Sequence, residues 1–363
     1  MNKLMQYGWN MYWENKWNKE ERSQHKPGRI IADHGQKYRI FTEEGEVWGE
    51  MSGKMQHTLQ SKGIYPAVGD WVQLHMLEGE GRAIIHSIID RKTSISRQKA
   101  GVKSAQEQLI AANVDVLFLV TSLNDDYNPR RMERYLIMAW NSGVNPVILL
   151  SKADLCDDAE MKAAEMELIA PGVPVHVVSA LENMGKDAVT GYLKEGVTVA
   201  LTGSSGCGKS TIVNWLAESI EQKTQGIREE DSRGRHTTTH RELFLLPQGG
   251  LMVDTPGMRE LQLYDDDGGG WEQVFADIET IGERCRFTDC EHENEAGCAV
   301  LAAVLDGELD EKRLQNYRKT QRELQFQIKK EARTQRKVNR KDHSAKEPVR
   351  RKSAFWNSRI SEE

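Results

Sequence analysis

The pattern of apolar and polar positions changes twice along the 363 residues of this chain. From residue 28 to about 97, short stretches that alternate apolar and polar residues are interrupted by glycines, and no long helical period appears. Such a pattern predicts short strands joined by turns. A small β-barrel fits, either an OB-fold, a type that often binds oligonucleotides, or an SH3-like barrel, and the pattern alone does not separate the two.

A parallel α/β sheet is predicted for the middle of the chain. Continuous apolar strands alternate there with helical patterns, which implies buried parallel strands with helices on both faces of the sheet. We expect strands at 114–122, 146–151, 173–179, 197–203, 241–247 and 250–255, and helices at 130–140, 157–168 and 186–194.

Both ends of the chain are predicted to be helical. After about residue 265 we expect helices at 271–282, at 299–305 and from about 310, with the last twenty residues disordered. Near the N-terminus, apolar side chains recur every four residues and predict one helix whose stripe packs on the body; they are Met5, Trp9, Trp13 and Trp17. The chain therefore divides into an N-terminal extension (1–25), a barrel (26–97), an α/β domain (98–265), a helical domain (266–340) and a basic tail (341–363).

The net charge of −6 hides an uneven distribution. Residues 311–352 hold 16 Lys or Arg against 5 Asp or Glu, so a basic C-terminal segment follows an acidic body. This favours a polyanionic partner such as RNA, although a solvated charged helix has the same composition. No apolar run is long enough for a membrane span and the N-terminus lacks the pattern of a secretory signal, so we expect a cytoplasmic protein with no membrane partner. We also expect a monomer.

The stretch "GSSGCGKS" (203–210) fits a phosphate-binding loop, because it follows an apolar strand and precedes a helical pattern. Its glycines let backbone N–H groups turn toward phosphate oxygens. Lys209 is expected to reach the β and γ phosphates, and the Ser210 hydroxyl to bind Mg²⁺. Cys207 lies inside the loop, where we expect it to fill space and not to act as a nucleophile.

A second strand end, "LMVDTPG" (251–257), follows the phosphate loop. Asp254 can hold Mg²⁺ through water, and the N–H of Gly257 can sense a γ-phosphate. Met258 comes next, at the position where Ras-like GTPases carry the glutamine that orients the attacking water. A thioether cannot do this, so the catalytic group must lie elsewhere.

The polar stretch "EEDSRGRHTTTHREL" (229–243) lies where a switch loop is expected. One of its three consecutive threonines, Thr237, Thr238 and Thr239, can bind Mg²⁺, and we favour Thr238 or Thr239. His236 is the nearest side chain suited to act on the attacking water, with a solvated loop histidine as the alternative. Arg233 and Arg235 compete for the catalytic role, because either can act as an arginine finger.

The stretch "LLSKADL" (149–155) ends another buried strand and predicts a guanine-reading loop. Asp154 can accept from guanine N1–H and the N2 amino group together, which adenine does not offer, and the stem of Lys152 can lie across the base. A backbone N–H of "VVSA" (177–180), at the end of the next strand, can meet guanine O6. The motifs together predict these GTP-binding residues: Ser151, Lys152, Ala153, Asp154, Ser179, Ala180, Gly203, Ser204, Ser205, Gly206, Cys207, Gly208, Lys209, Ser210, Thr211 and Gly257.

The base loops precede the phosphate loop, the reverse of the usual GTPase order. Ligands of a doubly wound sheet bind beyond the carboxyl ends of its strands, whichever strand comes first in the chain. Joining the old termini and cutting elsewhere would leave such a site intact. The order therefore predicts a circularly permuted GTPase domain that binds GTP with Mg²⁺, held by Ser210, Thr238 and Asp254.

The stretch "CRFTDCEHENEAGC" (285–298) predicts a metal site. Three thiolates and one imidazole would complete a tetrahedral Zn²⁺ shell, which makes the site structural because no position stays open. The ligands are Cys285, Cys290, His292 and Cys298. A single zinc ion would brace a small domain with little core of its own.

With these motifs, the chain closely resembles the family of ribosome small subunit-dependent GTPases (RsgA, also called YjeQ). The resemblance covers roughly residues 26–335 and rests on "VGDWV", on the permuted order "SKAD", "SA", "GSSGCGKST", "GRHTTT" and "DTPG", and on the cysteine cluster. It implies an OB-fold, a permuted GTPase domain and a C-terminal zinc domain. It also implies GTP hydrolysis stimulated by the small ribosomal subunit, a role in late maturation of that subunit, and rRNA as a partner. His236 matches the histidine to which the family assigns a catalytic role.

The base loop departs from the usual GTPase pattern at one position. Ser151 stands where GTPases usually carry an asparagine that ties the base loop to the phosphate loop, so we expect weaker nucleotide binding, while Asp154 keeps the recognition of guanine. Two other functions are alternatives to the GTPase. One is an RNA-binding scaffold whose GTPase fold holds nucleotide but turns it over weakly, against which Lys209, Ser210 and Asp254 argue. The other is an RNA-modifying enzyme with catalytic zinc, against which the four-ligand pattern argues.

Overall fold

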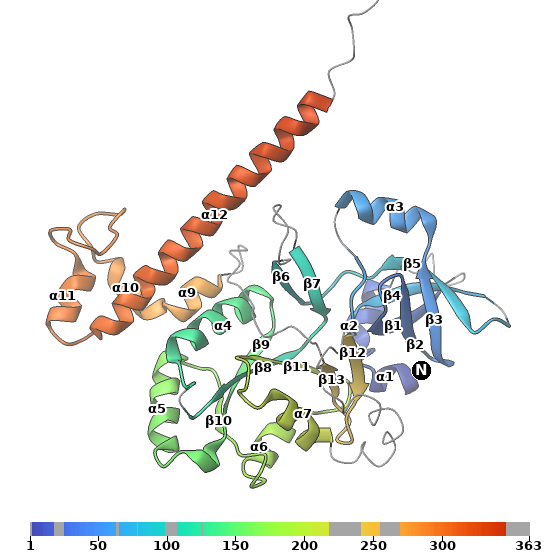
Figure 1. The fold of residues 1–363 in the computed structure, drawn as a ribbon, viewed down its shortest axis with the longest axis horizontal. Coiled ribbons are helices and arrows are strands. Elements are labelled where there is room, and N and C mark those ends of the chain that lie inside the picture. The colour runs from blue at the N-terminus through green and yellow to red at the C-terminus, as the bar shows by residue number, and fades with distance from the viewer. Residues whose placement is uncertain are drawn as a thin grey trace, which may run out of the picture.

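The computed structural model describes residues 2–17, 25–62, 65–77, 79–98, 107–124, 126–217, 241–254 and 269–345. Within these ranges, one sheet of eleven strands runs through an α/β domain and continues into a barrel. A helical unit packs on the opposite side of the α/β domain, and one long helix projects from it (Figure 1). None of the helices in the described ranges is long and apolar enough to cross a membrane.

Five strands form the barrel: β1 (Lys26–Asp33), β2 (Lys37–Thr42), β3 (Gly45–Met51), β4 (Trp71–Leu77) and β5 (Arg82–Ile88). They pair in the order β1-β2-β3-β5-β4, and β4 pairs again with β1 to close the barrel. β3 and β5 are parallel, whereas the other neighbours are antiparallel. The helix α3 (Gly53–Lys62) follows β3. This arrangement confirms the OB-fold over the SH3-like alternative.

The barrel core follows from alternation along its strands. Ile30, Ile40, Leu74 and Ile85 point inward and are fully buried. The sequence pattern did not predict α3, and the reason is its lack of an apolar stripe: among its described side chains, Met55 alone is buried.

The N-terminal extension forms two short helices, α1 (Asn2–Gln6) and α2 (Met11–Lys16), so the prediction of one continuous helix was wrong. The chain turns between them at Gly8, which has φ +89° and packs against the Gly196 carbonyl, where a Cβ would lie 2.6 Å from the oxygen. Because of the break, Met5 leaves the stripe and is 51% exposed. The other members of the stripe still pack on the body around Trp71; the cluster consists of Leu4, Trp9, Trp13, Trp17, Trp71 and Ile89.

The α/β part of the sheet has six strands: β8 (Val116–Ser122), β9 (Asn145–Ser151), β10 (Val175–Val177), β11 (Thr198–Gly203), β12 (Arg241–Leu245) and β13 (Leu251–Asp254). The order β10-β9-β8-β11-β13 is parallel throughout, as predicted. β12 differs, because it runs antiparallel to β13. The connection between them, 246–250, is too short for the crossover that a parallel pair needs.

Helices cover both faces of these strands, again as predicted. α4 (Pro129–Asn141) and α5 (Ala159–Ile169) contribute to one core cluster, while α6 (Lys186–Thr190) and α7 (Lys209–Ala217) contribute to another. Successive residues of β8 alternate between the two clusters: Leu117 and Leu119 belong to the first, Phe118 and Val120 to the second. The alternation explains why every residue of β8 is buried.

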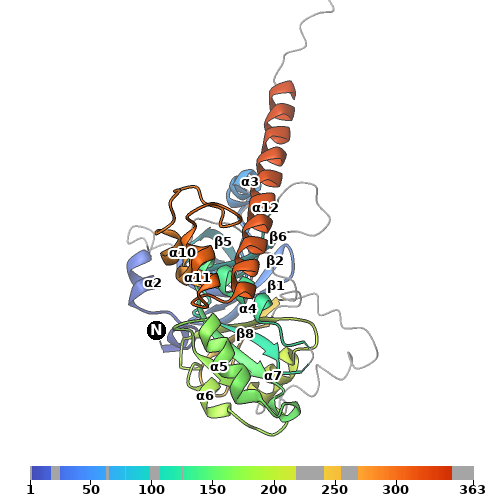
Figure 2. The ribbon, with the colours of Figure 1, turned by 90° about the vertical axis from the view of Figure 1, so that its left-hand side faces the viewer.

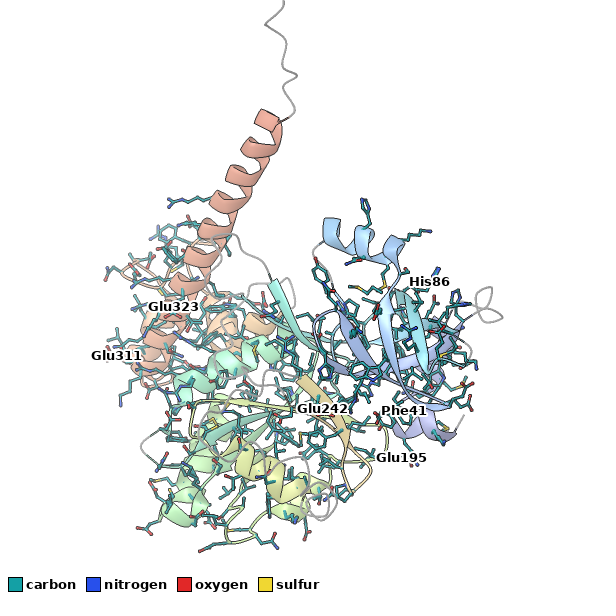
Figure 3. The ribbon with its side chains drawn as sticks, turned by 45° about the vertical axis from the view of Figure 1, so that its right-hand side comes forward. Phe41, His86, Glu195, Glu242, Glu311 and Glu323 are labelled. Atoms are coloured by element: carbon teal, nitrogen blue, oxygen red, sulfur yellow. The ribbon has the colours of Figure 1, made fainter. Side chains whose placement is uncertain are left out.

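Barrel and α/β domain share the sheet because β12 pairs with β1. Nη2 of Arg39 in β2 donates to Oε1 of Glu242 in β12 at 2.8 Å, and Figure 3 labels Glu242 at this junction. Beside it lies Arg29, whose guanidinium is buried and donates to four oxygens, those of Tyr7, Gly69, Asn113 and the Thr198 hydroxyl. Burial lowers the pKa of Arg29 to about 10. A separate hairpin of β6 (Ser94–Gln98) and β7 (Glu107–Ala112) lies near the same junction.

The helical unit consists of α9 (Gly270–Val274), α10 (Ala276–Gly282), α11 (Ala299–Leu305) and α12 (Glu311–Ala345). The single helix predicted at 271–282 is thus two helices, and the long charged helix continues to Ala345. Arg313 of α12 pairs with Glu133 of α4 and Asp277 of α10, and Arg134 of α4 pairs with Glu323, so α12 is attached to the α/β domain along its first turns. Its far end extends away from the body (Figure 2).

Candidate nucleotide site and metal centre

The strand ends that carry the predicted nucleotide motifs meet at one edge of the sheet. β9 ends at Ser151, β11 at Gly203 and β13 at Asp254, and these strands are parallel within the same sheet. Parallel strands place their carboxyl ends on one side, so motifs far apart in the chain share that edge. The reversed order of the motifs therefore leaves their arrangement in space unchanged.

The phosphate loop connects β11 to α7, which begins at Lys209. Gly203 has φ +155°, and a Cβ there would lie 2.2 Å from the Val120 carbonyl oxygen, so no other residue fits. The Lys209 ammonium donates to the carbonyls of Gly203 at 2.8 Å and Ser204 at 2.5 Å. Cys207 is fully buried in the core below the loop, in line with its predicted role as a filler.

The two base loops touch each other. The Ser179 hydroxyl donates to Oδ1 of Asp154 at 2.5 Å, and the N–H of Ala153 donates to the Val178 carbonyl at 3.2 Å. Lys152 precedes them in a left-handed conformation, with φ 58°. The Asp154 carboxylate is thereby oriented by a neighbour from the adjacent strand end. The N–H of Ser179 itself donates to the Met184 carbonyl at 3.1 Å, which leaves Ala180 as the residue expected to meet guanine O6.

Ser151 links the base loop to the phosphate loop although it replaces the usual asparagine. Its hydroxyl is buried and donates to the Cys207 carbonyl at 2.6 Å. A serine side chain is shorter than asparagine, but β9 brings Ser151 close enough to the loop for the hydroxyl to reach. Whether nucleotide affinity is reduced stays a prediction.

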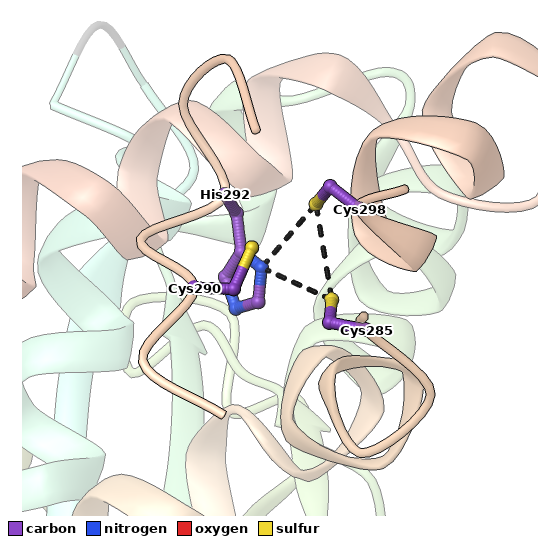
Figure 4. A group of neighbouring side chains, drawn as sticks. All are labelled: Cys285, Cys290, His292 and Cys298. Atoms are coloured by element: carbon purple, nitrogen blue, oxygen red, sulfur yellow. Dashed lines mark hydrogen bonds between the residues drawn. The ribbon is translucent and has the colours of Figure 1, made fainter. Parts of the chain in front are cut away.

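The four predicted metal ligands come together between α10 and α11 (Figure 4). Their ligand atoms all lie within 4.8 Å of one another, so the cluster could hold a metal ion. Nδ1 of His292 lies 3.6 Å from Sγ of Cys285 and 3.5 Å from Sγ of Cys298, and the two sulfurs are 3.8 Å apart. Burial lowers the pKa of His292, which favours the neutral imidazole that a metal requires.

Backbone N–H groups and a left-handed turn support this centre. The N–H groups of Ala299 and Leu301, in the first turn of α11, donate to the sulfurs of Cys285 and Cys298 at 3.3 and 3.4 Å. His292 has φ 59°, a conformation uncommon for a non-glycine residue, and Arg318 of α12 donates to its carbonyl. The long helix is therefore attached directly to the metal loop.

Known proteins are similar to this chain over most of its length. The sequence matches the family model described as RsgA GTPase over residues 88–264, and the model described as 50S ribosome-binding GTPase over 198–339. A protein of Vibrio parahaemolyticus named small ribosomal subunit biogenesis GTPase RsgA 2 is 44% identical over 325 residues, 90% of this chain and 87% of that one. An RsgA of Leptospira interrogans is 41% identical over 343 residues, 93% of each chain.

This chain belongs to the RsgA family of GTPases. Among solved structures, YjeQ from Thermotoga maritima is similar with a TM-score of 0.60 and 27% identity, over 83% of this chain and 98% of that one. YloQ, described as a circularly permuted GTPase, has the same fold with a TM-score of 0.59 and 23% identity, over 86% and 99%. The permuted order predicted from the motifs is thus confirmed for the fold, and the GTPase fold implies Mg²⁺.

Some of the predicted site residues lie within the described part of the chain and others do not. His236, Thr238, Gly257, Met258 and the arginines at 233 and 235 lie outside the described residues. Asp254 is described and lies exposed at the end of β13. One acidic side chain that the sequence analysis did not single out also reaches the phosphate loop, because Asp126 accepts from the Ser204 hydroxyl. No motif marks it, and only the loop after β8 brings it there.

Proposed function

We propose that this chain hydrolyses GTP in the presence of Mg²⁺ and acts as a cytoplasmic, monomeric factor in late maturation of the small ribosomal subunit, with rRNA as its partner. The observation that carries the proposal is the contact of Asp154 with Ser179 beside the phosphate loop, because it assembles a guanine-reading site next to a phosphate site. The relatives named small ribosomal subunit biogenesis GTPase support the assignment to that subunit.

Each part of the nucleotide has a proposed partner. The Asp154 carboxylate accepts from guanine N1–H and N2, and this double acceptance selects guanine over adenine. Backbone N–H groups of residues 203–208 surround the β-phosphate, while Lys209 leaves the carbonyls of its own loop to reach the β and γ phosphates. Ser210, Asp254 and Thr238 would hold Mg²⁺, which would offset the negative charge of the phosphates.

The catalytic group is proposed to be His236. Met258 supplies no side chain that can orient water, so the group must come from the stretch 229–243. Docking on the small subunit would bring His236 within hydrogen-bond reach of the attacking water, about 3 Å. Arg233 and Arg235 remain the competing residues of the same stretch.

The metal is proposed to be one structural zinc ion. In a tetrahedron with Zn–S of about 2.3 Å and Zn–N of about 2.0–2.1 Å, two sulfurs lie about 3.8 Å apart and a sulfur and a nitrogen about 3.6 Å. The separations of 3.8, 3.6 and 3.5 Å among Cys285, Cys298 and His292 agree with this. Cys290 supplies the fourth ligand, which leaves no position for a substrate and makes the ion a brace for the helical unit.

The test measures phosphate release from GTP with and without purified small subunits, across salt concentrations. Slow turnover alone and fast turnover with subunits are expected. His236→Ala should lose most of the stimulated rate while it keeps GTP affinity and subunit binding. GTP binding without any stimulated turnover would contradict the proposal and leave an RNA-binding scaffold. Full stimulated turnover in His236→Ala, together with none in Arg235→Ala, would move the catalytic role to the arginine.

A further inference from the structure

Two segments outside the phosphate loop hold it, one after β9 and one after β8, both on the same side of β11 in the sheet. Ser151 at the end of β9 donates to the Cys207 carbonyl at 2.6 Å. The Ser204 hydroxyl donates to Oδ2 of Asp126, in the loop that joins β8 to α4. A phosphate loop binds phosphate through backbone N–H groups that must converge on one point. Contacts that hold this backbone in place therefore influence the affinity of the loop for phosphate. Family motifs account for the position of Ser151 but not for Asp126.

Asp126 is itself held in place by its neighbours. Its N–H donates to Oδ1 of Asn124 at 3.2 Å, and Asn124 accepts there also from the buried Ser122 hydroxyl at 2.7 Å. Its Oδ1 accepts from Nη1 of Arg131 at 2.8 Å. Arg131 lies in the first turn of α4, where its N–H is capped by the Asn128 side chain at 3.1 Å. Both carboxylate oxygens therefore have partners, Arg131 within α4 and Ser204 directly after β11.

The carboxyl group of Asp126 is ionised at neutral pH. Partial burial acts to raise the pKa of Asp126, but the bonds from Ser204 and Arg131 and the nearby Lys152 charge outweigh it and hold that pKa below its usual value. An ionised carboxylate beside a phosphate site would repel phosphate if it were unpaired. The Arg131 guanidinium offsets this charge, so the carboxylate can hold the loop with less repulsion of the ligand.

We propose that Asp126 is a positioning residue for GTP: it holds the Ser204 turn so that the N–H groups of the phosphate loop are arranged before the nucleotide arrives. The inference rests on the proposed function, because the loop must bind GTP for its arrangement to matter. Pre-arranged donors lower the ordering cost of binding. Since these N–H groups meet the β-phosphate, which GTP and GDP share, the affinity for both nucleotides depends on Asp126.

The experiment titrates a fluorescent GDP and a fluorescent GTP analogue into the full-length protein with Mg²⁺. Asp126→Ala should raise both dissociation constants about tenfold, the loss of one hydrogen bond to a charged group. Asp126→Asn keeps an acceptor for the Ser204 hydroxyl and should recover most of the affinity. Asp157→Ala is the matched control, because it removes the same charge from an exposed position after the base loop and should change neither constant.

A double-mutant cycle links the effect to the proposed contact. Ser204→Ala should also weaken binding, and the double variant Asp126→Ala/Ser204→Ala should be no weaker than Asp126→Ala alone. The nucleotide-free melting temperature of each variant should stay near that of the wild type. A lowered melting temperature with unchanged affinity, or additive effects in the cycle, would overturn the inference and leave Asp126 as a structural residue.

Three further outcomes separate this inference from the proposed function. Wild-type protein that binds GTP beside an Asp126→Ala variant of equal affinity would overturn the role of Asp126 and leave the GTPase assignment standing. Tighter GTP binding by Asp126→Ala would also overturn it, because the carboxylate would then act by repulsion. Wild-type protein that binds neither nucleotide would overturn the proposed function and this inference together.

Discussion

Glu133 on α4 shows how burial and charge compete where the long helix meets the α/β domain. Its side chain is 4% exposed, and Oε1 accepts from the Arg313 guanidinium. Oε2 is buried and has no hydrogen-bond partner among the described residues. Burial raises the pKa of Glu133 to about 7, although the charge and hydrogen bond of Arg313 act to lower it. We predict that Glu133→Gln, which cannot ionise, removes a measurable pH dependence of stability.

The magnitude follows from the difference between folded and unfolded pKa values. The folded value of about 7 lies above the ordinary 4.5, so the folded state binds the proton more tightly. Stability from this group is fully present below pH 4.5 and is lost as the pH rises through about 7. At 1.36 kcal/mol per pKa unit, the loss between pH 5 and pH 8 is about 2.5 kcal/mol.

The assay is urea unfolding of the wild type and Glu133→Gln at intervals from pH 5 to pH 8, with zinc present throughout. Because other groups titrate equally in both proteins, the difference between their free energies of unfolding isolates Glu133. The variant should match the wild type at pH 5 and exceed its stability at pH 8 by about 2.5 kcal/mol. Glu323→Gln, which removes a half-exposed partner of Arg134 on the same helix, is the control and should show a smaller change. A difference that stays constant across this range would refute the reasoning.

Three further predictions concern the nucleotide and metal sites. Asp154→Asn should weaken GTP and favour xanthosine triphosphate, whose 2-oxo group accepts from the new amide; unchanged competition between the two would remove this loop from the site. Chelation should release one zinc ion per chain and make residues 269–345 sensitive to protease, while GTP binding largely survives. Cys298→Ser should have the same effect on protease sensitivity and on GTP binding. An unaltered digestion pattern would contradict a structural metal. Ser151→Ala should weaken GTP binding by about 1 kcal/mol, the value of a neutral hydrogen bond, whereas Ser151→Asn should retain it; equal affinity in the alanine variant would show that the link to Cys207 contributes nothing.

Local patterns were sufficient for most of the fold. Continuous apolar runs predicted the parallel strands, because a strand covered by helices on both faces has no polar side. The helix at 299–305 was predicted with its observed bounds, since its apolar run begins directly after Cys298. The cysteine and histidine spacing predicted the metal cluster, because ligands close in sequence can meet through local turns alone.

Where local patterns failed, contacts between distant segments decided the outcome. The N-terminal stripe predicted one helix, but Gly8 packs on Gly196 and breaks it there. β12 was expected in a parallel sheet, but its short connection to β13 makes it antiparallel, and its other edge pairs with β1 of the barrel. Gly196 and β1 are far from these segments in sequence, so no local window contains the cause of the break at Gly8 or of the pairing of β12 with the barrel. The antiparallel direction of β12 has a local cause, the short connection 246–250.

The candidate site divides in the same way. The sequence by itself determined which chemistry is present, because Lys209, Ser210 and Asp154 lie in motifs whose spacing along a strand, turn and helix makes their roles readable. Only the tertiary structure decided how the phosphate loop is held, through Ser151 at the end of β9 and Asp126 in the loop after β8. The physical reason is that a hydrogen bond between two loops depends on distances of a few tenths of an ångström, and those distances arise from the packing of the whole sheet.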